Sequence, residues 1–276
     1  MFIDTHSKES MLKSMCEIFH ISQFELNEVL YQIDQNAIDG DDYIKKLDDY
    51  IRECALDYPD EILLFHLSRR LHGTENDVGG RNLANLLTTD NAFSRLMKKA
   101  GIEFIKGVQH IDVFYNGTIV DWDECLHGNP SYMKSRLGYY KGREDFCFNG
   151  FAFRDRLYKN HYSLRLYEMP EFLCQLIECL GCKKVGDYYI EHSDYYCYEY
   201  KLPLEIVMFD AYDNYSLVQK QHYLISCVLQ RLVEYQTGDS RYMFDHDNPI
   251  LRLMDDYNVP ARYYVAKEKI TREMLL

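Results

Sequence analysis

Hydrophobic residues recur at spacings of three and four over residues 8–20, a pattern that predicts an amphipathic helix. Ser22, with Glu25 three positions later, indicates a capping box that opens a second helix. A third helix of the same period is predicted over residues 43–56. Pro59 marks the boundary after them, because the residue before a proline disfavours the helical conformation. Three short helices therefore precede the rest of the chain.

The pattern changes at residues 63–70, Leu-Leu-Phe-His-Leu-Ser-Arg-Arg, where apolar residues lie in a run too short for a helix. Such a run, bounded by charged residues, is typical of a buried strand. His66 and Ser68 fall on one face of this strand, near its end. A strand holds an imidazole and a hydroxyl toward a ligand more rigidly than a loop does. The alternative is a histidine that only satisfies a backbone carbonyl.

A polar, glycine-rich loop follows at residues 73–80, and Arg69, Arg70 and Arg81 bracket it. Loops of this kind bind phosphates through backbone amides, but the spacing here matches neither a P-loop nor a dinucleotide fingerprint. A surface loop without a ligand is the alternative interpretation.

Farther along, Asn116-Gly117 between alternating apolar residues predicts a β-hairpin over residues 111–120, so the sheet is at least partly antiparallel. Residues 121–144, around Trp122, are expected to form a loop, either a plain connection or a mobile lid. Other segments have the length and apolar pattern of helices or strands. The helices are 82–100, 170–180 and 217–234, the strands are 146–153, a pair within 188–200, 204–210 and 262–265, and 154–162 is a turn or short helix.

Composition limits the possible partners of the chain and the compartment in which it is expected. The chain has 276 residues with a net charge of −13, so a nucleic acid would bind only at a local basic groove. Its nine scattered cysteines favour a reducing compartment over a disulfide framework. No N-terminal signal and no run of 18 apolar residues is present, so we expect a cytoplasmic protein that does not span a membrane. The 25 tyrosines suit half-buried strands and ligand-stacking surfaces equally well.

Three fragments rich in aromatic residues follow one another at the predicted strands. They are Leu64-Phe65-His66-Leu67-Ser68, then Gly150-Phe151-Ala152-Phe153-Arg154-Asp155 with Lys159 and Tyr162, then Glu205-Ile206-Val207-Met208-Phe209-Asp210 with Tyr223-Leu224-Ile225. The set resembles the Leu-Trp-His-Gly-Ser, Gly-Ile-Tyr-Phe-Ala-Asp and Glu-Tyr-Ile-Val-Tyr-Asp strands of one family. This family is the ADP-ribosyltransferases of the His-Tyr-Glu type, which include the poly(ADP-ribose) polymerases. The order His, Tyr, Glu is the same in both.

The resemblance implies an enzyme that uses NAD, with Glu205, His66 and Tyr162 as catalytic residues. Glu205 would stabilise the oxocarbenium-like ribose of the transition state, and Glu199 is its rival for this role. Tyr162 would stack on the cationic nicotinamide ring. His66 would donate a hydrogen bond to a ribose hydroxyl, and Ser68 would bond the carboxamide. The NAD-binding residues that the resemblance implies are His66, Leu67, Ser68, Arg69, Arg70, Phe153 and Tyr162.

Two positions depart from the family pattern: Leu67 replaces a glycine, and Ala152 replaces an aromatic residue. The long interval between His66 and Tyr162 requires an inserted helix and hairpin. The implied fold is α+β, a mixed, mostly antiparallel split β-sheet with packed helices, preceded by a helical N-terminal region. Residues 1–58 would form this N-terminal cap or partner-binding region, and residues 59–276 the ADP-ribosyltransferase-like domain.

The expected function is transfer of ADP-ribose, as a single unit, from NAD to a macromolecule, in the setting of a bacterial toxin or phage-defence effector. The alternative is a catalytically inactive binding module, such as an antitoxin-like or inhibitor protein, that meets a partner protein through residues 1–58. A structural zinc site is a weaker alternative, because its possible ligands include only one close cysteine pair, so no metal is expected. These possible ligands are Cys179, Cys182, His192 and Cys197.

Basic residues cluster near the proposed site although the chain is acidic overall. They are more than the two phosphates of NAD require, so a second polyanion, RNA or DNA, is a hypothesis for the acceptor. More broadly, the acceptor is expected to be a nucleic acid or a protein. The alternative is that several of them pair with nearby acids such as Glu144 and Asp155. The basic residues are Arg69, Arg70, Arg81, Arg136, Arg143, Arg154, Arg156 and Lys159.

Overall fold

The structure is a computed structural model that describes residues 1–237 and 248–275. The chain divides into two compact units, each made of several segments. Unit 1 comprises Met1–Phe65, Gly150–Asn160 and Tyr200–Arg252, and unit 2 comprises His66–Asn149, His161–Glu199 and Leu253–Leu276.

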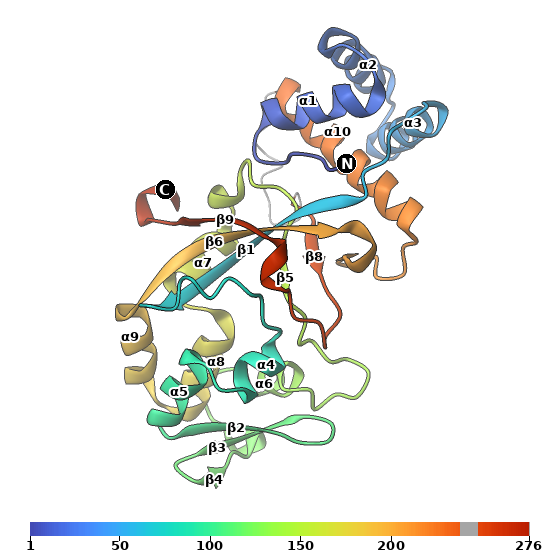
Figure 1. The fold of residues 1–276 in the computed structure, drawn as a ribbon. Helices are drawn as coiled ribbons and strands as arrows, with labels where there is room; N and C mark the ends of the chain where they lie inside the picture. The colour runs from blue at the N-terminus through green and yellow to red at the C-terminus, as the bar shows by residue number, and fades with distance from the viewer. Residues whose placement is uncertain (238–247, 276) are drawn as a thin grey trace. The chain divides into compact units, whose positions relative to one another are not determined.

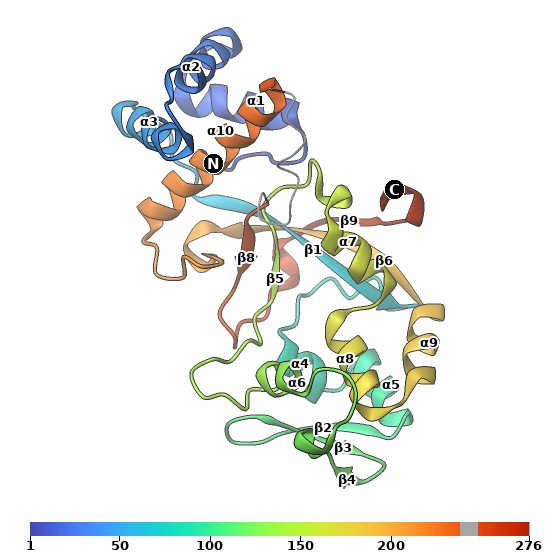
Figure 2. The same ribbon diagram turned by 180° about the vertical axis from the view of Figure 1, so that it is seen from behind.

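The N-terminal helices belong to unit 1 and gather around one long helix from the C-terminal part of the chain. Both ribbon views show α1, α2 and α3 beside α10 (Figures 1 and 2). The four helices are α1 (Lys8–Phe19), α2 (Gln23–Asn36), α3 (Gly40–Glu53) and α10 (Leu217–Thr237). The apolar faces predicted for the first three helices explain this packing, because buried Leu26, Leu30 and Leu47 line the inner sides of α2 and α3.

The predicted capping box at the start of α2 is confirmed. The Ser22 hydroxyl accepts from the Glu25 N–H at 3.2 Å, and the Glu25 carboxylate accepts from the Ser22 N–H at 2.8 Å. The carboxylate also accepts from the Ser22 hydroxyl at 2.7 Å, and this hydrogen bond, with the one from the Ser22 N–H, lowers the pKa of Glu25. Helix α3 begins three residues earlier than predicted, because Asp39 caps it and Gly40 is its first residue.

A six-stranded antiparallel sheet runs through the structure, and β1 and β6 each contribute residues to both units. A three-stranded sheet and packed helices complete the architecture, so the predicted α+β class with a mostly antiparallel sheet and N-terminal helices is confirmed. The strands of the larger sheet, in order across it, are β7 (Met208–Phe209), β8 (Ile250–Arg252), β5 (Asn149–Phe151), β1 (Glu61–Leu71), β6 (Ser193–Pro203) and β9 (Tyr264–Lys269).

Close pairing of β1 with β5 depends on a glycine. Phe65 faces Phe151 in the antiparallel register. A Cβ atom on Gly150 would lie 2.5 Å from the Leu64 side chain and 2.7 Å from the Phe65 carbonyl. Only a residue without a side chain fits there.

Unit 2 has its own hydrophobic core between the smaller sheet and a set of short helices (Figures 1 and 2). Trp122, Leu176 and Val113 are among its buried residues. The strands are β2 (Ile102–Lys106), β3 (Ile111–Tyr115) and β4 (Thr118–Ile119), and the helices are α4 (Leu83–Thr88), α5 (Ala92–Lys99), α6 (Pro130–Arg136), α7 (His161–Glu168), α8 (Glu171–Leu180) and α9 (Lys183–Glu191).

The predicted hairpin is confirmed, because β3 and β4 pair across the Asn116-Gly117 turn. Both turn residues have positive φ, 51° and 80°, as a type I′ turn requires. Strand β2, which pairs with β3, was not predicted separately.

Several predicted boundaries are wrong. The helix expected over 82–100 is two helices, because Asn91 caps a new helix through the Ser94 N–H. The loop expected over 121–144 contains α6, which begins at the signal Asn129-Pro130. By contrast, the turn or short helix expected over 154–162 is confirmed as the 3-10 turn η2 (Leu157–Lys159), and α7, which follows it, was not predicted.

The two C-terminal strand predictions also need correction. The strand pair expected within 188–200 is helix α9 followed by the single strand β6. The strand expected at 204–210 is the 3-10 turn η3 (Leu204–Ile206) followed by the two-residue strand β7. Pro203 favours this break, because a proline lacks the N–H that a central strand needs.

The division at residue 58 stays a prediction, while the two compact units follow a discontinuous division of their own. Among the residues that the structure describes, no helix is both long enough and apolar enough to cross a bilayer.

Candidate functional site

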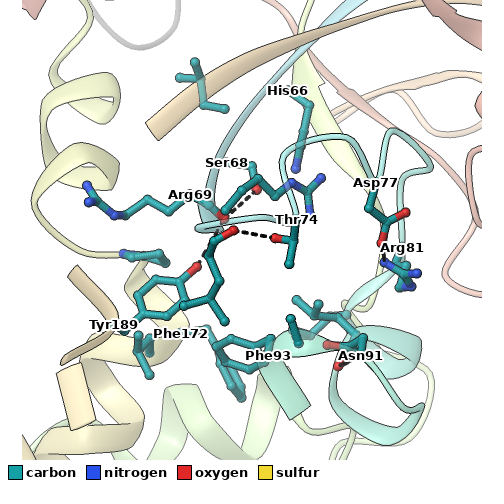
Figure 3. Close-up of a pocket in the computed structure, with 18 of the residues that line it drawn as sticks. His66, Ser68, Arg69, Thr74, Asp77, Arg81, Asn91, Phe93, Phe172 and Tyr189 are labelled. Atoms are coloured by element: carbon teal, nitrogen blue, oxygen red, sulfur yellow. Dashed lines mark hydrogen bonds and ion pairs between the residues drawn. The ribbon is translucent and has the colours of Figure 1, made fainter. Parts of the chain in front are cut away.

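A pocket of about 490 Å³ lies within unit 2, against β1. Its walls come from β1 residues 66–71, from the loop after this strand, and from α4 and α5. The segment 147–149 and parts of α7, α8 and α9 close the other sides. Its volume falls in the range of ordinary small-molecule sites. Figure 3 shows this pocket and the side chains that line it.

His66 lies at the pocket, in the middle of β1 and not near the strand's end as predicted. Its Nδ1 lies 2.7 Å from the carbonyl oxygen of Asn149. Since a carbonyl can only accept, Nδ1 carries the hydrogen. The neutral ring then has Nε2 as a hydrogen-bond acceptor. Phe148 stacks on the same ring, with centroids 4.2 Å apart.

The environment keeps this imidazole neutral. Burial is the main cause that lowers the pKa of His66, to about 4, and the positive charge of Arg70 adds to it. The hydrogen bond to Asn149 opposes this shift only in part. At pH 7 His66 can therefore accept a hydrogen bond but not donate one through Nε2. This does not fit the sequence-based expectation that it donates to a ribose hydroxyl.

Ser68 and an aromatic floor add a polar and an apolar side to the pocket. The Ser68 hydroxyl makes only a long hydrogen bond, 3.4 Å, to the Arg69 carbonyl. In the close-up, His66 and Ser68 lie on one side and the rings of Phe93 and Phe172 lie across from them (Figure 3). A ligand with a flat ring and polar groups would find both kinds of contact here.

Arg69, a predicted NAD-binding residue, is bound to the chain itself. Its guanidinium donates to the carbonyl oxygens of Tyr167, Ile190 and Ser193 at 2.6, 3.1 and 2.8 Å, and to the Ser193 hydroxyl at 2.9 Å. The Tyr189 hydroxyl in turn donates to the Arg69 carbonyl at 3.1 Å. Arg69 therefore joins β1 to the ends of α7 and α9 and to the start of β6.

Three further arginines at the pocket are paired with carboxylates. Arg81 binds Asp77 at 2.5 Å, and Arg95 binds Asp90 at 2.7 Å. Arg136 forms an ion pair with Asp145. The prediction that several basic residues pair with nearby acids is confirmed for Arg81 and Arg136, with Asp77 and Asp145 as the acids.

The glycine-rich loop after β1 is held in place from β9 and β6. Lys267 donates to the Glu75 carbonyl and to the Asn76 side chain, both at 2.7 Å. The Tyr198 hydroxyl donates to the same Glu75 carbonyl at 2.8 Å. The loop lines the pocket through residues such as Thr74, so these anchors fix one of the pocket walls.

The other predicted site residues have different positions. Leu67 is buried and lines the pocket, whereas Phe153, Tyr162 and Glu205 do not line it. Tyr162 opens α7 of unit 2 and is 36% exposed. Phe153 and Glu205 belong to unit 1. The predicted roles of these three residues stay predictions.

Glu205 lies in η3 with an exposed side chain. The buried Lys220 donates to its carbonyl oxygen at 2.7 Å, so the backbone that carries this carboxylate is anchored. Burial lowers the pKa of Lys220, and the charge of Glu205 acts against this shift. Glu199, the rival carboxylate, lies on β6 in unit 2.

Sequence reasoning missed the aromatic residues that complete the pocket. Phe93 is the second residue of α5, Phe172 lies in α8, and Tyr189 lies in α9, so they are far apart in the chain. Phe148 was assigned to a strand but not to the site. The alternating apolar pattern of the predicted strands does not indicate that these aromatic side chains meet at one pocket.

Among residues 1–237 and 248–275, no group of three or more histidine, cysteine or acidic side chains has the geometry of a metal site. The four possible zinc ligands therefore do not form such a group. Cys179 lies in the last turn of α8 and Cys182 precedes α9, whereas Cys197 is buried in β6.

The observed architecture defines an α+β protein with a pocket on the central strand of its larger sheet. Comparisons of the chain with protein-family models, with curated proteins and with solved structures found no match in any of the three.

Proposed function

We propose that the protein is an NAD-dependent ADP-ribosyltransferase of the His-Tyr-Glu type, in which the pocket on β1 binds NAD. The three-fragment resemblance is one support for this proposal. The other is that His66, Ser68 and Arg70, on one face of β1, all line a pocket of ligand size. The floor of Phe93 and Phe172 offers a contact surface for a base or a nicotinamide ring.

The observation that carries the proposal is the fixed tautomer of His66. A catalytic or structural histidine on a surface is usually free to titrate near pH 6.5. Here the Asn149 carbonyl holds Nδ1–H, and the lowered pKa keeps Nε2 without a proton. A ribose hydroxyl is a hydrogen-bond donor of the right kind for this nitrogen. His66 would therefore orient the ribose as an acceptor.

In the proposed reaction the bond between ribose C1′ and the nicotinamide nitrogen breaks, and nicotinamide leaves as a neutral molecule. Positive charge then develops on the ribose ring, and a carboxylate stabilises it. The proposal gives this role to Glu205 and gives the ring that stacks on nicotinamide to Tyr162. The acceptor nucleophile forms the new bond to C1′ and loses its proton.

We further propose transfer of a single ADP-ribose unit to a macromolecule in the cytoplasm, as a toxin or phage-defence effector would do. NAD is available in this compartment, and the nine cysteines, none of which forms a disulfide, suit its reducing conditions. The acceptor in this proposal is a nucleic acid or a protein.

Two measurements test this function. Glu205→Gln keeps the shape of the side chain and removes its charge, so turnover of NAD should fall about 100- to 1000-fold while NAD binding stays. Unchanged turnover in this variant would move the role to Glu199 or refute the catalytic assignment.

The second measurement identifies the class of acceptor. The protein is incubated with labelled NAD and cell extract, and the labelled product is then digested with nuclease or with protease to find which treatment releases the label. No label in any macromolecule would contradict transfer.

A second candidate function is binding of a partner protein through the N-terminal helices. The observation that favours it is the exposure of large apolar side chains there: Phe24 is 78% exposed and Ile38 is 89% exposed. A module of this kind would keep its partner complex in Glu205→Gln and lose it in Phe24→Asp. If the protein is a transferase, its NAD turnover should be lost in Glu205→Gln and kept in Phe24→Asp.

A further inference from the structure

The arginines at the pocket differ in what their guanidinium groups already bind. Arg69 donates four hydrogen bonds to the chain itself. Arg81, Arg95 and Arg136 each pair with a carboxylate. A guanidinium with such partners has little positive potential left for a ligand, because its charge is already balanced or its donors are used.

Arg70 is different. Within residues 1–237 and 248–275 no carboxylate or carbonyl binds its side chain. Its hydrogen-bonding neighbour is the Tyr198 hydroxyl, and its Nε is buried without a hydrogen-bond partner. Its guanidinium lies over the ring of Tyr198, 4.8 Å from the centroid. A buried donor without a partner costs stability, so such a group is usually completed by a ligand or by water.

The position of Arg70 on β1 gives this donor two polar neighbours. Side chains at alternate positions of a strand point to the same face, so His66, Ser68 and Arg70 lie on one face of β1. All three line the pocket. In the close-up, Asp77 and Arg81 lie apart from His66 and Ser68 and bind each other (Figure 3).

We propose that Arg70 is the anion-binding residue of the pocket, and that it holds a phosphate or pyrophosphate group of the ligand beside Ser68. This inference rests on the proposed function for the identity of the ligand, the pyrophosphate of NAD. The anion site itself rests only on the contacts of Arg70. Arginine suits this role because its planar fork of donors matches the oxygens of a phosphate.

The positive charge of Arg70 acts on its neighbour, since it adds to burial in lowering the pKa of His66. A bound anion would cancel much of that effect. Besides His66, the charged and titratable residues that line the pocket are Arg69, Arg70, Asp77, Arg81, Asp90, Arg95, Arg136, Cys147, Tyr189 and Tyr195. Asp77 and Arg81 balance each other, and Tyr189 stays neutral because burial raises its pKa to about 12.

The test is calorimetric titration of the full chain with inorganic pyrophosphate and with nicotinamide riboside, which lacks phosphate. Arg70→Met should weaken pyrophosphate binding about 10- to 100-fold and leave binding of the riboside unchanged. Arg70→Lys keeps the charge and should retain part of the affinity. Arg81→Met, which removes a paired arginine, should change it less than about threefold.

Pyrophosphate binding in Arg70→Met equal to that of the wild type, or an equal loss in Arg81→Met, would overturn the proposal. So would an absence of binding by the wild type at millimolar pyrophosphate. If binding depends on Arg70 but the wild type neither binds nor cleaves NAD, the anion site stands and the proposed function fails. If Arg70→Met turns over NAD with an unchanged KM, the anion site fails and the function stands.

Discussion

Neighbouring residues of β1 have separate tasks that follow from the alternation of the strand. His66, Ser68 and Arg70 share one face and line the pocket. Leu67 and Arg69, at the alternate positions, also border the pocket but are buried, and Arg69 binds backbone carbonyls. Ligand binding and structural support are thus interleaved within five residues.

The lowered pKa of His66 predicts a specific pH dependence of stability. The unfolded chain binds a proton on this ring near pH 6.5, whereas the folded chain does so only near pH 4. The unfolded state therefore binds more protons in this window, and the free energy of unfolding should decrease as the pH falls from 6.5 to 4. The full effect is about 3 kcal/mol at most.

His66→Gln serves as the comparison, because glutamine donates a hydrogen bond but does not titrate. Urea unfolding at pH 7 and pH 4.5 should show a smaller loss of stability for the variant than for the wild type. Parallel pH curves for the two proteins would show that His66 titrates normally in the folded state.

Arg69 should matter for stability far more than the other pocket arginines. Arg69→Met leaves three backbone carbonyls and the Ser193 hydroxyl without their donor, so we expect a loss of about 2–4 kcal/mol, visible as a lower melting temperature. Arg95→Met breaks only an exposed ion pair and should cost less than about 1 kcal/mol. Equal losses in both variants would contradict the structural role of Arg69.

At the scale of elements, the loop after β1 is part of the site because another strand holds it. Lys267 of β9 and Tyr198 of β6 both donate to the Glu75 carbonyl. Lys267 lies far along the chain from the loop, so only the folded sheet brings them together.

Lys267→Met should loosen this loop. Amide hydrogen exchange of residues 74–77 should become faster, with little change in the core strands, because the loss is confined to two hydrogen bonds. Lys269→Met is the matched control on the same strand, since it removes only an ion pair with Asp194. If amide exchange of the loop also becomes faster in the control, the loop depends on β9 in general and not on the hydrogen bonds of Lys267.

Local signals explain which elements the sequence predicts correctly. The Ser22–Glu25 cap and the Asn116-Gly117 turn act within four residues, so the chain around them suffices. Tyr189 was assigned to a strand because tyrosine favours strands, but packing against unit 2 places it in α9. The same distinction between local and tertiary signals applies to the pocket. His66 could be predicted from its own strand, whereas Phe93 and Phe172 reach the pocket only through tertiary structure.

At the scale of the whole molecule, binding and turnover can be measured separately. The pocket lies within unit 2, whereas Glu205 belongs to unit 1. Under the proposed function, a change at Glu205 should alter the rate of NAD cleavage and leave the affinity of the pocket as it is, because its charge acts on the transition state. Changes at His66 should alter the affinity.

Calorimetric titration of the full chain with NAD tests the central claim most directly, with the wild type beside His66→Ala and Glu205→Gln. The account predicts saturable binding by the wild type, affinity about tenfold weaker in His66→Ala because one hydrogen bond to the ribose is lost, and unchanged affinity in Glu205→Gln. Absence of binding at millimolar NAD, or equal affinities of the wild type and His66→Ala, would contradict an NAD site at this pocket.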